Sequence, residues 1–329
     1  MRIVFMGSSP ASVECLRAIL REPELEVVGV VTQPDRPAGR GKALTPSAVA
    51  RFAAEHGIAD ILKPDRVNDP EPMAWLRERR PDVIAVVAYG QILKQPLLDL
   101  PLFGCVNCHF SLLPKYRGAA PVVAALEAGE RLTGVTVMHM GPGLDDGPIM
   151  LQSFEPIYPD TTGGALMNDL AIAGGCALAK ALRLLNRNAL PPEVPQDDAA
   201  ATFVKKLKKT DGLIDWDRPV IVTERKIRAY NPWPGSYTFL PERFRRKGNT
   251  GRVVVTGLEF LKTDQINPAW RAELPGTVVS VTERGPVVRT GDGVLRLTAL
   301  KADGARELAG GEFLRGRPLT PKIDMLLES

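Results

Sequence analysis

Short, wholly apolar segments alternate with helix-forming segments in the first third of this sequence. The predicted strands are residues 3–6, 26–31 and 82–88, and the predicted helices are residues 11–20, 48–56 and 73–79. Strands that are apolar along their whole length are buried on both faces, which is typical of a parallel sheet covered by helices. The sequence therefore predicts an α/β fold with a doubly wound, mostly parallel sheet.

A dinucleotide-binding version of this fold is disfavoured. The turn after the first strand reads Gly7-Ser8-Ser9-Pro10 and contains one glycine where a dinucleotide site has G-x-G-x-x-G. We therefore do not expect this Rossmann-like sheet to bind a dinucleotide.

The composition changes after a long Ala- and Leu-rich helix that is predicted over residues 160–187. Residues 186–200 are rich in Pro, Asn and Asp, which is typical of a linker. Short segments with β-branched residues then follow between turn markers, at residues 251–255, 276–281, 286–290 and 294–297. Regular short strands with few helices predict a small β-barrel. We expect one domain over residues 1–188, a linker over 189–207 and an OB-like barrel over 208–329.

Charge is distributed unevenly along the 329 residues, which carry a net charge of +4. Residues 1–204 hold 19 Lys and Arg against 23 Asp and Glu, a net −4, whereas residues 205–329 hold 23 against 15, a net +8. A basic last third is consistent with a polyanion or a membrane surface as partner, but on charge alone a solvated basic face is the favoured explanation.

The composition indicates a cytoplasmic enzyme. Four cysteines are too few for a disulfide scaffold, and the first seven residues read as a strand and turn rather than as a signal peptide. The apolar runs noted above, such as residues 83–88, are far shorter than a membrane span. We expect no membrane partner and a monomer.

Two polar residues at a strand end form the strongest candidate site. Asn107 and His109 follow the apolar residues 103–106, and their i, i+2 spacing places both side chains on one face of a strand. The turn Gly143-Leu144-Asp145-Asp146-Gly147 follows another apolar strand and can bring a carboxylate to the same point. An amide donor, an imidazole and a carboxylate suit acyl-type transfer without a covalent enzyme intermediate.

The other two histidines have simpler explanations. His56 lies at a predicted helix C-terminus, where an imidazolium suits the helix dipole. His139 alternates with Met138 and Met140 on a strand, and a structural role is the better interpretation.

The pattern C-x-x-C-H at residues 105–109 also matches haem attachment, and C-x-x-C alone suggests metal or redox chemistry. A buried strand is the wrong setting for each, since a redox cysteine normally starts a helix and no second ligand pair for zinc is apparent. We interpret Cys105 and Cys108 as small buried hydrophobic residues.

The residues that carry these features resemble the folate-dependent formyltransferase family. The family pattern N-x-H-x-S-L-L-P-x-Y-R-G matches residues 107–118, T-G-V-T matches 133–136 and G-L-D-x-G matches 143–147. The loop T-Q-P-D-R-P-A-G-R-G-K, residues 32–42, resembles that of members acting on initiator methionyl-tRNA, as do D-G-L-I-D-W at 211–216 and R-A-Y-N-P-W-P-G at 228–235.

The resemblance implies a formyltransferase catalytic domain and a direct attack of an amine on the formyl carbon of 10-formyltetrahydrofolate. Asn107 and His109 would donate hydrogen bonds to the oxyanion that forms, and such a donor contributes about 3 kcal/mol of transition-state stabilisation. Asp145 would stabilise the imidazolium and, through water, help to remove the amine's proton. No metal is required.

The resemblance also assigns the folate site to two loops. By matching positions, the pterin would lie against the residues Tyr89, Gly90, Gln91, Ile92, Leu93, Ser111, Leu112, Leu113 and Pro114. Gly90 suits this position because glycine permits close approach of a ligand to the backbone.

The acceptor would be the α-amino group of initiator methionyl-tRNA, and formylation would serve translation initiation. Basic residues predicted to contact the tRNA lie in the 32–42 loop and in the second domain: Arg36, Arg40, Lys42, Lys206, Lys208, Lys209, Arg245, Arg246 and Lys247. The second group fits a basic face on an oligonucleotide-binding barrel that gives electrostatic affinity rather than sequence readout.

Three other functions remain open from the sequence. The main alternative is a formyltransferase that acts on a nucleotide-linked amino sugar, which would share Asn107, His109 and Asp145. An RNA-binding protein with an inactive enzyme domain would bind tRNA without formyl transfer. A hydrolase of formyl-folate would release formate without an amine acceptor.

Overall fold

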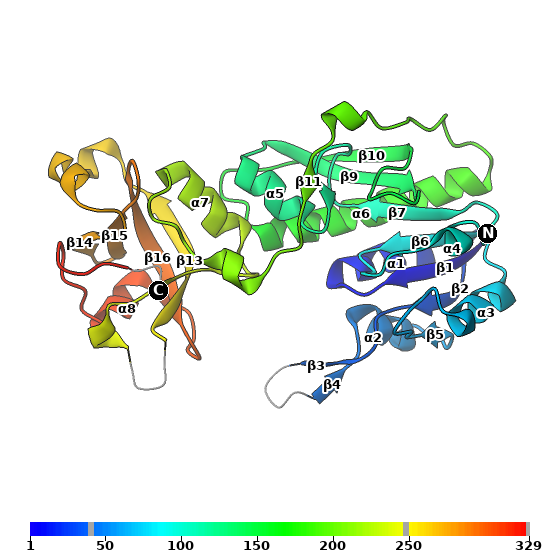
Figure 1. Ribbon diagram of the computed structural model, residues 1–329, viewed down its shortest axis with the longest axis horizontal. Coiled ribbons are helices and arrows are strands. Elements are labelled where there is room, and N and C mark those ends of the chain that lie inside the picture. The colour runs from blue at the N-terminus through cyan, green and yellow to red at the C-terminus, as the bar shows by residue number, and fades with distance from the viewer. Residues whose placement is uncertain (39–42, 246–249, 327–329) are drawn as a thin grey trace. The chain divides into compact units, whose positions relative to one another are not determined.

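A seven-stranded, mostly parallel sheet lies at the centre of the region where strands and helices alternate (Figure 1). The strand order is β10(Ile149–Pro156), β9(Leu132–His139), β7(Cys105–His109), β6(Val83–Val87), β1(Arg2–Gly7), β2(Glu26–Val31) and β5(Ile61–Leu62). The pairs from β7 to β5 are parallel, whereas β9 is antiparallel to both β7 and β10. The predicted doubly wound, mostly parallel α/β sheet is thus confirmed.

The computed structural model describes residues 1–38, 43–245 and 250–326 and separates two compact units. Unit 1 consists of Met1–Pro121, Arg131–Ile157 and Leu166–Lys205, and unit 2 consists of Val122–Glu130, Tyr158–Ala165 and Lys206–Ser329. Residues 189–205, most of the predicted linker, are therefore grouped with unit 1. The predicted domain boundaries themselves stay a prediction.

The helices of unit 1 cover both faces of its sheet. They are α1(Pro10–Leu20), α2(Ala48–Glu55), α3(Pro70–Arg79), α4(Gln95–Leu98) and most of α6(Gly163–Asn186). Met73 and Leu76 of α3 and Leu97 of α4 pack in one cluster with Val4, Met6, Ile84 and Val86 from β1 and β6. Since side chains alternate along a strand, the remaining residues of these strands face the other layer.

Small residues let α6 lie close to the opposite face of the sheet. A Cβ on Gly174 would lie 2.9 Å from Cys108 Sγ, and one on Gly175 would lie 2.8 Å from Glu14 O in α1. Any larger side chain at either position would push α6 away from β7 and α1. Close helix packing therefore depends on this glycine pair.

α6 is also the one helix among the described residues that is long and apolar enough to cross a membrane by length and composition. More than half of its most apolar stretch is buried inside the protein. A helix in the core of a protein passes the same test of length and composition.

Helix starts in unit 1 follow from local sequence. Ser9 caps α1 by accepting a hydrogen bond from Ser12 N, and Pro10 occupies the first turn. Ser47 caps α2 in the same way through Ala50 N. His56 ends α2, and its Nδ1 donates to Phe52 O over 2.8 Å, which confirms the predicted helix C-terminus.

Two small pairings complete unit 1. β3(Arg36–Ala38) and β4(Ala43–Thr45) are antiparallel and flank residues 39–42, which lie outside the described residues. β8(Arg117–Gly118) pairs in parallel with β11(Phe203–Val204).

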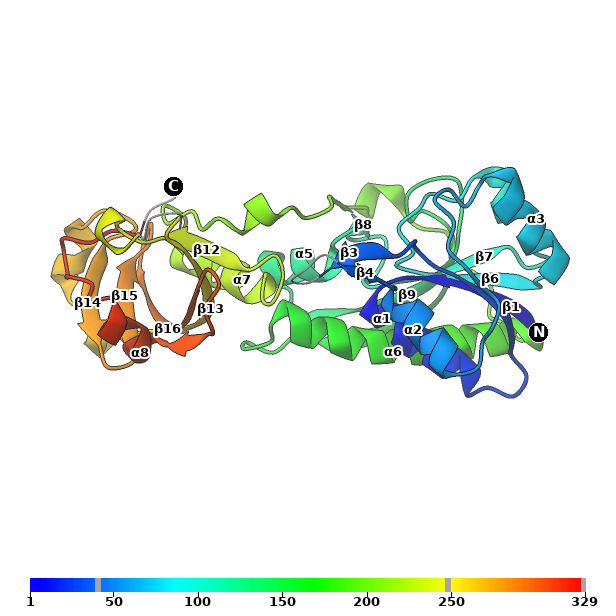
Figure 2. The same ribbon diagram turned by 90° about the horizontal axis from the view of Figure 1, so that it is seen from below.

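Unit 2 contains an antiparallel sheet that curves round its own core (Figure 2). Its path is β12(Ser236–Phe239), β13(Arg252–Phe260), β16(Val294–Ala302), β15(Gly285–Arg289) and β14(Val278–Thr282), and β17(Leu308–Ala309) also pairs with β16. The helices of unit 2 are α5(Pro121–Ala128), α7(Val220–Ala229) and α8(Gly310–Gly316). Four of these strands are those predicted from the sequence, so the barrel-like second domain is confirmed.

We expect Phe5→Ala to lower the free energy of unfolding by about 3–5 kcal/mol, because Phe5 is fully buried and its removal leaves a cavity in the sheet's core. Urea denaturation of the full chain measures this loss. Phe154→Ala is the matched control, since the side chain at that position is 61% exposed on β10; equal losses in the two variants would contradict the expectation.

Candidate functional site

β7 brings Asn107 and His109 to the carboxyl end of the parallel strands. Both are buried, with 8% and 6% of their surface exposed. Asn107 is in register with Val86 of β6 and Met138 of β9, so β7 is held from both sides. The alternation along β7 gives both side chains the same face, as predicted.

His109 is held by a hydrogen bond at one ring nitrogen and faces a carboxylate with the other. Its Nε2 lies 2.9 Å from Tyr116 O, and because a carbonyl only accepts, Nε2 carries the proton of this hydrogen bond. Its Nδ1 faces Asp145 Oδ2 at 3.6 Å. That distance is too long for a hydrogen bond, so Nδ1 keeps its capacity to bond a substrate atom while lying in the field of the carboxylate.

Asp145 reaches His109 from a strained turn. Its φ is +50°, in the left-handed region that non-glycine residues rarely adopt. Oδ2 accepts a hydrogen bond of 2.8 Å from Gly118 N, and the Asp145 carbonyl accepts one of 2.9 Å from Gln196 Nε2. The structure therefore brings Asp145 to His109, as the sequence predicted.

Asn107 differs from its neighbours because its side-chain amide is uncommitted. Within residues 1–38, 43–245 and 250–326 it has no protein hydrogen-bond partner, although the residue is nearly buried. Although the residue is only 8% exposed, its amide atoms are not among the buried polar atoms of the described residues that lack a partner, so solvent or a ligand can reach them. Asn107 is thus free to donate to a reacting oxygen.

The loop Ser111–Pro114 is held by one buried hydroxyl. Thr136 Oγ1 donates to Ser111 O over 2.7 Å and accepts from Leu113 N and Gln152 Nε2, each at 3.0 Å. The Ser111 hydroxyl is used internally, since it donates to Lys115 O. Leu112 and Pro114 are half-buried, whereas Leu113 is buried. The loop offers a ligand its backbone and apolar surface.

The second predicted ligand loop follows β6. Tyr89 is buried, its carbonyl accepts from Ser8 Oγ and Gln33 Nε2, and burial raises the pKa of its phenol. Gly90 has φ +91°, which favours glycine. Gln91 is already engaged, because its amide bonds Pro64 O and Val67 N.

The last two residues of that loop differ in exposure. Ile92 is 82% exposed, whereas Leu93 belongs to the core cluster. An exposed apolar side chain beside a buried one is compatible with an apolar ligand that lies over the loop.

The two cysteines of the C-x-x-C-H pattern are buried on opposite faces of β7. Burial raises the pKa of the Cys105 thiol to about 12, and Cys105 Sγ lies 3.8 Å from Leu97 O. Cys108 packs against α6 near Gly174. The interpretation as small buried hydrophobic residues is confirmed.

His139 has a structural role, as expected. Its Nδ1 is 2.6 Å from Glu193 Oε1, and its Nε2 is 3.1 Å from Phe103 O. Both ring nitrogens are therefore engaged away from Asn107.

The predicted tRNA-contacting residues fall into three groups. Arg36 is exposed on β3 and donates to Gln33 Oε1, and Lys206, Lys208 and Lys209 are exposed in unit 2. Arg245 is half-buried and donates through Nε to Leu240 O. Arg40, Lys42, Arg246 and Lys247 lie outside the described residues.

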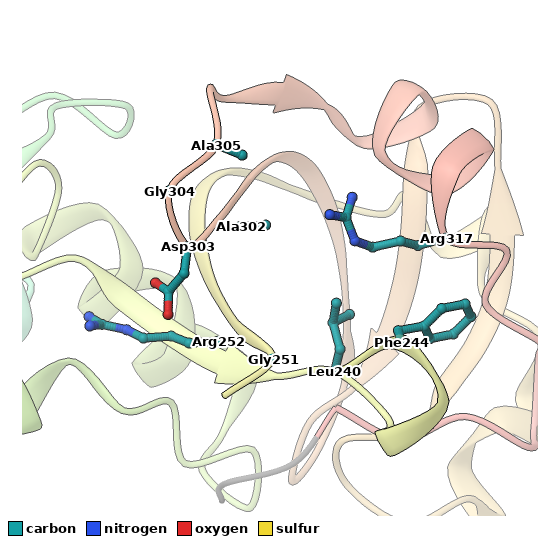
Figure 3. Close-up of a pocket in the computed structure, with 9 residues that line it drawn as sticks. All are labelled: Leu240, Phe244, Gly251, Arg252, Ala302, Asp303, Gly304, Ala305 and Arg317. Carbon is teal, nitrogen blue, oxygen red and sulfur yellow. The ribbon is translucent and has the colours of Figure 1, made fainter. Parts of the chain in front are cut away.

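Unit 2 contains a pocket of about 230 Å³ whose rim carries further charge (Figure 3). Arg252 stacks over Tyr237 at 3.9 Å and Arg317 over Phe313 at 4.6 Å, and neither forms an ion pair within the described part of the chain. Figure 3 shows Arg252 and Asp303 on one side of the pocket and Arg317 on the other. Sequence reasoning missed both arginines, because neither lies in a basic run.

No group of three or more His, Cys, Asp or Glu side chains that could hold a metal ion occurs among the described residues.

Sequence profiles of known families match both parts of the chain. A profile described as formyl transferase matches residues 1–182, and one described as formyl transferase, C-terminal domain, matches residues 206–318. The curated methionyl-tRNA formyltransferase of Pseudomonas entomophila is 44% identical over 317 residues, which are 96% of each chain. That of Magnetococcus marinus is 39% identical over 315 residues, 96% of this chain and 95% of the relative.

Solved structures share the fold at lower identity. The sugar 3N-formyl transferase WlaRD, crystallised with dTDP and 5-N-formyl-THF, has a TM-score of 0.60 and 17% identity, with 94% of this chain and 98% of that chain covered. HypX from Aquifex aeolicus in complex with tetrahydrofolic acid has a TM-score of 0.61 and 18% identity, with 95% and 47% covered.

We expect Thr136→Val to destabilise the full chain by about 1–3 kcal/mol, because Leu113 N and Gln152 Nε2 would both lose a buried acceptor. Thr136→Ser retains the hydroxyl and is the control. Thermal unfolding of the two variants checks this, and equal stability of Thr136→Val and the parent would contradict the role of the hydroxyl.

Proposed function

This chain belongs to the formyl transferase family, and on that premise we infer that it is a one-carbon transferase that formylates initiator methionyl-tRNA for translation initiation. Curated relatives that carry the name methionyl-tRNA formyltransferase are 39–44% identical over 96% of the chain. The product is N-formylmethionyl-tRNA.

One observation supports the chemistry: His109 Nδ1 lies 3.6 Å from Asp145 Oδ2, on the strand face that also carries the unpartnered amide of Asn107. This combination supplies two donors for a developing oxyanion and a carboxylate that can receive or relay a proton.

The proposed reaction is a direct transfer from 10-formyltetrahydrofolate, the donor substrate. The neutral α-amine of methionyl-tRNA attacks the formyl carbon, a C–N bond forms, and the carbonyl oxygen becomes an oxyanion. Collapse breaks the bond between this carbon and N10 of the folate. The proton lost by the amine balances the proton that N10 gains.

The side chains divide this work. The Asn107 amide donates to the oxyanion, and the Nδ1–H of a protonated His109 donates a second hydrogen bond, since Tyr116 O already occupies Nε2. Asp145 stabilises that proton by its charge and accepts the amine's proton through water. No step requires a metal.

The two loops that flank β7 and β6 fit the donor. Ser111–Pro114 and Tyr89–Leu93 follow neighbouring parallel strands, and the carboxyl ends of such strands form the ligand crevice of doubly wound sheets. The backbone of Tyr89–Leu93, with Gly90 left-handed and Ile92 exposed, suits a flat heterocycle that bonds main-chain groups.

The acceptor would be held mainly by charge. Arg36, Arg40 and Lys42 would clamp the acceptor stem. Lys206, Lys208, Lys209, Arg245, Arg246, Lys247, Arg252 and Arg317 would give unit 2 electrostatic affinity for phosphates. The division into residues 1–188, 189–207 and 208–329, a cytoplasmic location, a monomer and the absence of a membrane partner belong to the same proposal.

An acceptor that is a nucleotide-linked amino sugar is less favoured. The sugar 3N-formyl transferase shares the fold at 17% identity, whereas the methionyl-tRNA formyltransferase of Pseudomonas entomophila is 44% identical over nearly the whole chain.

Formyl transfer from 10-formyltetrahydrofolate tests the proposal, with purified methionyl-tRNA, an amino-sugar nucleotide and no acceptor in parallel reactions. Product on the tRNA alone is the expected result. Product on the sugar alone would overturn the acceptor, and free formate alone would indicate a hydrolase.

We expect Asn107→Ala to lower kcat by about 10²–10³-fold, since one oxyanion donor is removed. His109→Ala and Asp145→Ala should also lose orders of magnitude, with little change in tRNA affinity. His56→Ala is the control, because that histidine caps α2. Steady-state kinetics decide, and near-normal turnover in any of the three variants would remove that residue from the mechanism.

Arg252→Ala should weaken tRNA binding, and the slope of log K against log salt should fall by about one for each phosphate that the variant no longer neutralises. Arg40→Ala should likewise raise KM for methionyl-tRNA. Arg306→Ala is the control, since that exposed side chain is already paired with Glu312. An unchanged salt slope in Arg252→Ala would separate the unit 2 pocket from tRNA binding.

A further inference from the structure

Residues 193–204, which we call the site strap, run through the predicted linker yet are bonded to the loops of the candidate site. At its start, Val194 pairs with Ile149 through two backbone hydrogen bonds of 2.8 and 2.9 Å. At its end, β11 pairs with β8. The strap is thus anchored to unit 1 on both sides of Gln196.

Gln196 uses both ends of its amide inside unit 1. Its Nε2 donates to Asp145 O over 2.9 Å and to Gly147 O over 2.7 Å. Its Oε1 accepts from Arg117 Nε over 3.1 Å. One side chain therefore joins the turn that carries Asp145 to the strand that follows the Ser111–Pro114 loop.

The Asp145 turn requires such a partner. A φ of +50° is unfavourable for an aspartate, and such strain persists only where surrounding bonds over-determine the conformation. The two carbonyls held by Gln196 lie on either side of Asp146, so the amide spans the whole turn.

Arg117 connects Gln196 to the residues that bond His109 and Asp145. Its guanidinium is buried, bonded to Gln196 and to Asp198 Oδ1 at 2.8 Å. The residue before it, Tyr116, accepts the hydrogen bond of His109, and the residue after it, Gly118, donates to the Asp145 carboxylate. Both catalytic groups are thus one hydrogen bond away from a neighbour of Arg117.

The backbone of the strap fixes the same neighbours. Thr202 Oγ1 accepts from Tyr116 N at 2.8 Å, and Thr202 O accepts from Arg117 N at 2.8 Å. Gly118 has φ +116°, and a Cβ there would lie 2.2 Å from Val204 O. This close approach of β11 to β8 leaves little freedom for Gly118 N, the donor to Asp145.

We propose that Gln196 is a positioning residue for formyl transfer: its amide locks the Asp145–Gly147 turn to Arg117 and so holds the Asp145 carboxylate at His109. The inference rests on the proposed function, because it takes Asp145 as the group that acts in the reaction.

The test uses the full-length enzyme with saturating 10-formyltetrahydrofolate. Gln196→Ala removes the bonds to Asp145 O, Gly147 O and Arg117 Nε. Gln196→Glu keeps the size of the side chain and an acceptor for Arg117, but turns a carboxylate oxygen towards two carbonyls. Gln95→Ala is the matched control, since Gln95 is exposed at the start of α4 and its side-chain amide bonds Asp99 Oδ1 at the end of the same helix.

Both Gln196 variants should lower kcat by about 10- to 100-fold, as a displaced catalytic group does, while KM for methionyl-tRNA stays within about twofold. When Asp145→Ala is already present, adding Gln196→Ala should lower kcat by less than about threefold further, because Gln196 then has no carboxylate to position.

An unchanged kcat in Gln196→Glu, a change in KM alone, or an equal loss of kcat with and without Asp145 would each overturn the role of Gln196. Thermal unfolding of Gln196→Glu shows whether a loss of kcat reflects unfolding, and a loss of kcat that parallels unfolded protein also counts against the proposal. Failure of the proposed function is distinguishable, since the parent enzyme would then itself show no turnover with methionyl-tRNA, whereas retained turnover in Asp145→Ala would remove only the role of Asp145.

Discussion

The alternation of side chains along β7 is the constraint on which the site depends. Val106 and Cys108 are buried on the face that packs against α6, so Asn107 and His109 are forced onto the other face. A shift of one residue in the pairing with β6 and β9 would bury the two polar side chains under α6 and turn a cysteine towards the substrate. The apolar core of the sheet thus fixes the register, and the register fixes the orientation of the reactive groups.

Unfavourable backbone conformations are concentrated in the loops around the candidate site. Of the six described non-glycine residues with positive φ, Ala88, Tyr116 and Asp145 lie in the loops around the site. Each such conformation costs of the order of 1–3 kcal/mol and persists because neighbouring residues bond the backbone there. Next to Ala88, the carbonyl of Tyr89 accepts from Ser8 and Gln33. The backbone of Tyr116 is bonded by Thr202, and that of Asp145 by Gln196. A site organised in this way needs little rearrangement when the charge develops on the formyl oxygen.

The sequence predicted the features that local patterns encode. Apolar strands between helices predicted the sheet, the i, i+2 spacing predicted the shared face of Asn107 and His109, and the helix end explained His56. It did not predict the internal use of Gln91 and Ser111, because both bond groups that only the folded loops bring near.

Gln196 and Thr136 were missed for the same physical reason. Gln196 bonds Arg117 and Asp145, which are 79 and 51 residues away in the chain, and Thr136 bonds loop residues more than 20 positions earlier. A Pro-, Asn- and Asp-rich composition predicts an absence of regular structure, but it carries no information about which distant carbonyls a glutamine in that segment will meet.

The site strap determines how short a fragment of this chain can be and still contain a complete catalytic site. A fragment that stops at the end of α6 contains Asn107, His109 and Asp145, yet it leaves the buried Arg117 guanidinium and the Asp145 and Gly147 carbonyls without their Gln196 partner. The smallest portable module therefore extends to about residue 205, where unit 1 ends. Anyone who grafts this chemistry onto another acceptor-binding domain must carry the strap along with the sheet.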